Sequence, residues 1–133
     1  MEMQMDWLLE NKVAKFNVQG DATVEDLRHV SETIEEFINQ SDAPLVHILH
    51  DERGLGTLPI SLKVLTESLG FLKHPRLGWF IIYGNNDRIK KFLSSMVMGM
   101  AKIRHRNFET LEEALNFLVT VDSTLPSPEE MLK

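Results

Sequence analysis

The sequence contains no cysteine, which excludes disulfides, thiolate metal sites and thiol catalysis. No run of about 18 apolar residues occurs, and residues 1–6 lack the basic start and apolar core of a signal peptide. P-loop, dinucleotide-binding and G-x-S-x-G motifs are also missing. We therefore expect a cytoplasmic protein, by default a bacterial one, that spans no membrane, is not an enzyme and needs no cofactor.

Composition indicates one folded unit. Of the 133 residues, 43% are hydrophobic and 26% are charged, which is the balance of an ordinary globular protein. A chain of this length normally builds one core. Pro126 and Pro128 end the regular pattern near the C-terminus. The sequence thus predicts one domain over residues 1–125 and a flexible tail over residues 126–133.

Charge is unevenly distributed along the chain, whose formal net charge is -6. Residues 1–60 carry 4 Lys or Arg and 12 Asp or Glu, residues 61–108 carry 9 and 2, and residues 109–133 carry 1 and 6. The middle block includes Arg88, Lys90, Lys91, Lys102, Arg104 and Arg106. Few aromatic side chains accompany them. The pattern therefore favours a solvated surface, or contact with an acidic protein such as a second copy, over nucleic acid.

Hydrophobic periodicity predicts alternating strands and helices. Strands are expected at residues 5–10, 12–18, 44–50, 79–83 and 103–108, and helices after residues 22, 60, 86 and 109. The fold class is therefore α/β, in the order β-β-α-β-α-β-α-β-α. Strands joined through helices should be parallel, and the first two should form an antiparallel hairpin. We expect a mixed, mostly parallel sheet of about five strands with four helices.

The loop after the third predicted strand carries a short motif. Asp51, Gly54, Leu55 and Gly56 match the Asp-Ser-Ser-Gly-Leu-Gly signature of STAS domains, the fold of anti-sigma-factor antagonists, and the element order resembles that family. The resemblance implies a regulatory, protein-binding module. Arg53 stands where the family has a phosphorylated serine, so the phosphorylation switch would be lost. The predicted partner surface comprises Asp51, Glu52, Arg53, Gly54, Leu55, Gly56 and Thr57.

A second resemblance concerns ligands. Residues 74–79 and 83–85 look like a SpoIIAA-like group that shares the STAS fold, and this fold is similar to the lipid-binding CRAL-TRIO domain. The resemblance implies a carrier or sensor of a small apolar or lipid ligand as the alternative function. Met96, Met98 and Met100 are the candidate ligand or homodimer surface, because thioethers adapt to apolar partners. Helical spacing favours core packing for Met96 and Met100 and places Met98 elsewhere.

His47, His50, Asp51 and Glu52 form the densest group of side chains suited to metal binding or acid–base chemistry. On a strand, His47 and His50 should face opposite sides because their spacing is odd, whereas His50 and Glu52 share a face if the strand continues. The spacing therefore does not favour a metal or catalytic site. A hydrolase or metal enzyme is the third hypothesis, after the interaction module and the ligand carrier.

Overall fold

The computed structural model describes residues 1–133 and contains five strands, four helices of seven or more residues and two shorter helical segments. The strands are β1 (Glu2–Leu9), β2 (Val13–Gln19), β3 (Val46–Asp51), β4 (Leu77–Tyr83) and β5 (Arg104–Phe108). The helices are α1 (Val24–Gln40), α2 (Leu62–Ser68), α3 (Arg88–Ala101), α4 (Leu111–Val121) and α5 (Pro128–Met131), with the 3-10 turn η1 (Gly70–Lys73) after α2. The predicted α/β class and element order are confirmed, with η1 and α5 added.

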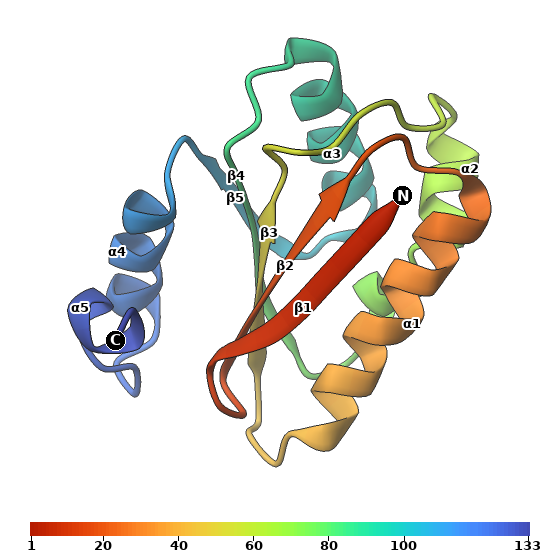
Figure 1. Ribbon diagram of the computed structural model, residues 1–133. Coiled ribbons are helices and arrows are strands. Elements are labelled where there is room, and N and C mark those ends of the chain that lie inside the picture. The colour runs from red at the N-terminus through yellow and green to blue at the C-terminus, as the bar shows by residue number, and fades with distance from the viewer.

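The five strands form one sheet in the order β1-β2-β3-β4-β5 (Figure 1). β1 runs antiparallel to β2, and the remaining neighbours are parallel. Only a short turn joins β1 to β2, whereas each later pair of neighbours is joined through at least one helix, as parallel pairing requires. β3 is the middle strand, and this position accounts for its nearly continuous apolar run.

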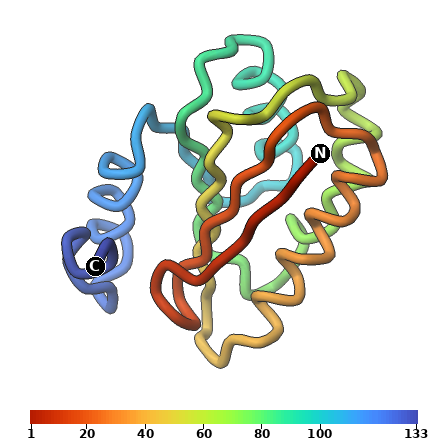
Figure 2. Tube along the Cα trace, in the orientation of Figure 1, coloured from red at the N-terminus to blue at the C-terminus, as the bar shows by residue number.

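Helices cover both faces of the sheet, and the two layers differ in size. α1, α2, η1 and α3 lie on one face, and α4 with α5 lies on the other (Figure 1). The first layer encloses a core of 18 buried residues and the second a core of 8. In Figure 2 the N-terminus lies at the β1 edge and the C-terminus lies beside α4.

α1 begins where the sequence predicted. Thr23 Oγ1 accepts a hydrogen bond from the Asp26 N–H, and the Asp26 carboxylate accepts one from the Thr23 N–H. This capping box pairs two N–H groups that would otherwise lack partners at the helix start. Val30, Ile34 and Ile38 then form the buried stripe that holds α1 against the sheet.

Residues 126–133 do not form the predicted tail. Ser127 caps α5, whose first residue is Pro128, and proline is favoured at the first helical position. The turn carries Met131 into the smaller core, where it is 3% exposed. A proline in the interior of a helix breaks it, but proline is also common at the first helical position, so the two prolines do not decide between a tail and a helix. A single buried methionine forms no periodic pattern that would have predicted the helix. The prediction of a flexible tail is therefore corrected to an ordered, packed turn.

Candidate functional site: an apolar pocket beside His50

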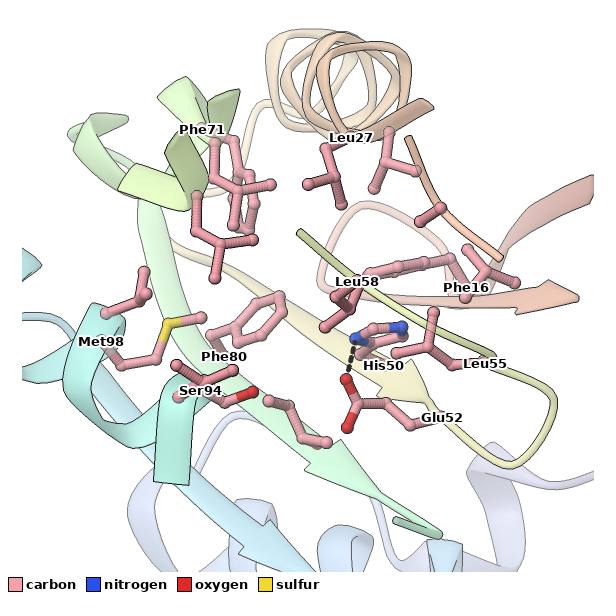
Figure 3. Close-up of a pocket in the computed structure, with 18 of the residues that line it drawn as sticks. Phe16, Leu27, His50, Glu52, Leu55, Leu58, Phe71, Phe80, Ser94 and Met98 are labelled. Carbon is pink, nitrogen blue, oxygen red and sulfur yellow. Dashed lines mark ion pairs between the residues drawn. The ribbon is translucent and has the colours of Figure 1, made fainter. Parts of the chain in front are cut away.

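An apolar pocket lies between the sheet and the larger helical layer. Its volume is about 70 Å³, and 16 of the 19 residues that line it are hydrophobic. β2, β3 and β4 supply its floor, while α1, α2, η1 and α3 supply its walls (Figure 3). Leu55 and Leu58, from the loop between β3 and α2, also line it. Protein interiors are normally filled, so this space is the first candidate for a binding site.

Aromatic rings form the floor of the pocket. Phe16 of β2 and His50 of β3 are register partners, and their rings stack with centroids 4.1 Å apart. The Phe80 ring of β4 lies 6.3 Å from that of His50, and the Phe71 ring of η1 lies 5.3 Å from that of Phe80. Alternate residues of a strand point the same way, so these strands present their rings side by side on one face.

His50 and Glu52 form the polar part of the wall, and the prediction that they share a face is confirmed. His50 Nδ1 lies 3.4 Å from Glu52 Oε2 (dashed in Figure 3), and the two side chains are 12% and 4% exposed. Glu52 Oε1 accepts a hydrogen bond from Asn85 Nδ2 at 2.5 Å. His50 Nε2 is buried and has no hydrogen-bond partner in the protein. Burial lowers the pKa of His50 and outweighs the opposing charges of Glu52 and Asp51, so the ring is neutral at pH 7.

His47 lies three residues earlier on β3 and faces the smaller helical layer. Its Nε2 lies 2.8 Å from Asp122 Oδ2, and its Nδ1 accepts a hydrogen bond from the Trp79 N–H at 2.9 Å. Because Nδ1 is an acceptor, the neutral ring carries its hydrogen on Nε2 and donates it to Asp122. Burial lowers the pKa of His47 despite this partner. Both ring nitrogens are therefore used within the fold.

The geometry separates the side chains that the sequence grouped as metal or acid–base candidates. His47 and His50 lie on opposite faces of the sheet, as predicted from their spacing. No group of three His, Asp or Glu side chains lies close enough to hold a metal ion. The hydrolase or metal-enzyme hypothesis thus gains no site from this arrangement.

The predicted partner surface is only partly a surface. Asp51 and Glu52 are buried, whereas Arg53 and Thr57 are exposed. Arg53 Nη2 lies 2.7 Å from Asp51 Oδ2. Burial disfavours the charged form of Asp51, but hydrogen bonds from the Arg53 side chain and backbone outweigh burial and hold the pKa of Asp51 below its ordinary value. Asp51 therefore positions Arg53 and does not itself face a partner, which corrects that part of the prediction.

The two glycines of this loop have a packing role. The Gly20 N–H donates to the Gly54 carbonyl at 3.0 Å, and the Gly56 N–H donates to the Gly20 carbonyl at 2.9 Å. A Cβ at Gly54 would collide with the Gln19 side chain, and one at Gly56 would collide with Asp21 Oδ1. The close approach of two loops thus explains both glycines without a partner.

The three methionines of α3 divide between two environments, and their predicted placement is wrong. Met98 is 5% exposed and lines the pocket, whereas Met96 and Met100 are 39% and 59% exposed on the outer side of the helix. Leu93 and Val97 complete the inner side with Met98. α3 is apolar around much of its circumference, so periodicity alone does not decide which side faces the sheet.

Most pocket residues could not be found from the sequence. Phe16, Leu27, Phe71 and Ser94 lie on four separate elements, and each also fits an ordinary core or surface position. Only the tertiary arrangement brings them together. The one available signal was the His50–Glu52 spacing, which places a polar pair on a buried face.

Comparison of the chain with protein-family models and with curated proteins gives no match. The similarity to STAS-like domains therefore stays a prediction, based on the element order and on residues 51–56. No helix combines the length and apolar character needed to cross a bilayer. The sheet, the pocket and the surrounding charges are the observations from which a function is proposed.

Proposed function

We propose that the protein is a non-catalytic domain that binds a small, largely apolar molecule in the pocket beside His50. The pocket carries this proposal, because 16 of its 19 lining residues are hydrophobic. It also includes residues at the carboxyl ends of β3 and β4, where ligands commonly bind in open α/β sheets. A volume of about 70 Å³ suits a molecule, or part of one, with only a few non-hydrogen atoms.

The polar wall restricts the charge of the ligand. Glu52 is an acidic side chain that is almost fully buried, and the neighbouring His50 is neutral at pH 7. An organic anion would lose its hydration in this apolar pocket, whose lining contains no Lys or Arg to compensate. The pocket therefore favours uncharged molecules over organic anions of the same size.

Methionine-methyl NMR tests the proposal on the full chain. We expect 1-chloropropane to shift the Met98 methyl resonance saturably, because Met98 lines the pocket. The resonances of Met96 and Met100 should not follow, because these side chains lie outside. Propionate should bind at least about tenfold more weakly, since burying its carboxylate without a cation costs more than about 1.4 kcal/mol.

Two neighbouring serines of α3 provide a matched pair of variants. Ser94 lines the pocket, whereas Ser95 is exposed on the outer side. Ser94→Leu should fill the space and abolish the Met98 shift, and Ser95→Leu should preserve it. A Met98 resonance that does not respond in the wild type, or that responds equally in both variants, would overturn the proposal.

A STAS-like interaction module is the second candidate, and the arrangement of Arg53 favours it. Its side chain is 71% exposed, and Asp51 holds the guanidinium through two oxygens at 2.7 to 3.2 Å. An exposed cation that is already oriented loses little side-chain entropy on binding. The contact proposed is between Arg53, with the exposed Thr57 of the same loop, and an acidic protein surface.

Affinity purification with Arg53→Gln tests this second candidate. Arg28 offers the control, because it is another exposed arginine paired with a carboxylate, that of Glu25 at 2.9 Å. A specific partner should be recovered with the wild type and with Arg28→Gln but lost with Arg53→Gln. Equal recovery with both variants would remove Arg53 from the interaction surface.

A further inference from the structure

The outer side of α3 exposes a continuous apolar row. Ile89, Phe92, Met96 and Met100 follow one another at helical spacing and remain outside the core. Ile89 is 66% exposed and Phe92 is 64% exposed. Large side chains at this exposure are individually common, but a full row along one helix marks a contact surface.

A second row beside the first carries positive charge. Arg88 and Lys91 lie one helical row from the apolar residues, together with Ser95 and Gly99, and Lys102 is the left-handed C-cap that ends the helix. None of the three cations takes part in an ion pair within the protein. Residues 88–108 contain no Asp or Glu, so no acidic side chain of the helix itself offsets them. The space over Gly99 is also open, which leaves the helix backbone accessible there.

We infer that this outer side of α3 binds an anionic lipid surface. A helix with an apolar row and adjoining Lys and Arg lies in the plane of a bilayer surface, with its apolar side chains among the acyl chains and its cations at the lipid phosphates. The formal net charge of the chain is -6, but its acidic residues are concentrated in residues 1–60 and 109–133. Salt screens exposed charges that lie more than about 10 Å apart, so the charges close to α3 decide whether it is attracted to an anionic surface. This inference does not depend on a ligand in the pocket, which the opposite side of α3 lines.

Charge and shape both disfavour a protein as the occupant. In a two-fold dimer formed by α3 against α3, the positive rows of both copies would lie in the same interface. A protein partner also needs roughly 800 Å² on each side of the interface, which is more than one convex helical row supplies. A fluid lipid surface needs no matching shape, so it suits a single exposed helix better.

Vesicle co-sedimentation with the full chain tests the inference. We expect binding to vesicles of phosphatidylcholine containing about one-third phosphatidylglycerol. Binding to pure phosphatidylcholine should be at least about tenfold weaker, because each Lys or Arg near an anionic surface contributes about 1 kcal/mol. Raising the salt concentration to about 0.5 M should reduce the binding to the anionic vesicles.

Variants separate the lipid surface from the other occupants. Phe92→Ser should weaken vesicle binding about tenfold, since it removes one inserted aromatic side chain. Val121→Ser removes an exposed apolar side chain of α4 and should leave binding unchanged. Absence of binding to the anionic vesicles, or equal loss in both variants, would overturn the inference. If Phe92→Ser changes only the sedimentation of the protein without vesicles, the outer side of α3 is instead a contact between copies of the chain.

Discussion

The two helical layers lie on the same sheet, and the pocket beside His50 lies under the larger one alone. β3 shows the contrast most directly, because it sends His47 to one layer and His50 to the other. His47 uses both ring nitrogens, through Asp122 and the Trp79 N–H. His50 keeps one buried nitrogen without a partner beside the apolar space. Burial alone therefore does not decide the role of a histidine. His47, whose two ring nitrogens both have partners, belongs to the architecture, whereas His50, with one buried nitrogen that lacks a partner, marks the candidate site.

Truncation of core side chains should show the largest difference between the layers. Leu118 of α4 is fully buried in the filled layer, so Leu118→Ala should create a new cavity and cost about 3 to 5 kcal/mol. Met98→Ala only enlarges an existing pocket, and we expect a cost near 2 kcal/mol. Urea unfolding measures both free energies. Equal losses would mean that the two layers are packed alike and would break the comparison.

Replacement of each histidine by leucine tests the same contrast through hydrogen bonds. His47→Leu leaves the Trp79 N–H without its acceptor, and we expect a loss of about 2 to 3 kcal/mol in the free energy of unfolding. His50→Leu removes the 3.4 Å contact with Glu52, which keeps its bond from Asn85, and replaces the ring stacking on Phe16 by aliphatic packing, so about 1 kcal/mol is expected. A larger loss for His50→Leu would assign that ring to the architecture as well.

Acid should destabilise the protein in two stages. Burial lowers the pKa of His47 and of His50 below the ordinary value of 6.5. Below pH 6.5 the unfolded chain therefore binds protons that the folded chain does not, and the free energy of unfolding falls with falling pH. For Asp122, burial is outweighed by hydrogen bonds from Thr124 and His47, which lower its pKa from 3.8 to about 2. A further loss should begin as the pH falls below 3.8 and continue towards 2.

Urea midpoints between about pH 7.5 and 5 measure the first stage. His50→Leu removes one of the three rings whose pKa folding lowers, the others being His47 and His105, so its midpoint should depend less steeply on pH than that of the wild type. His47→Leu should reduce the slope in the same way, although it lowers the midpoint at every pH. A midpoint that stays constant over this range would show that none of these rings takes up a proton on unfolding.

The sheet was predictable because its signals are local. The Thr23 cap, the apolar run of β3 and the short turn between β1 and β2 each follow from neighbouring residues. Parallel pairing then follows from the helices that intervene. The opposite directions of His47 and His50 needed only the two-residue period of a strand.

The site was not predictable because its signals are tertiary. Met98 faces the pocket and Met96 faces outward, although the helical spacing predicted the reverse, since α3 has apolar residues on both sides. Asp51 looked like an exposed motif residue, but the fold buries it and pairs it with Arg53. Unfilled space has no sequence pattern, because it depends on how separate elements meet.

Filling the pocket should give the smallest effect on stability, with the opposite sign from the truncations. Ser94→Leu adds apolar volume to the hollow layer, and we expect a gain of about 0.5 to 1 kcal/mol in the free energy of unfolding. Ser95→Leu adds the same atoms to the exposed side of α3 and should stay within about 0.5 kcal/mol of the wild type. Parallel urea titrations measure both. Destabilisation by Ser94→Leu would mean that the pocket has no room for a leucine side chain, and the contrast between the two layers would then fail.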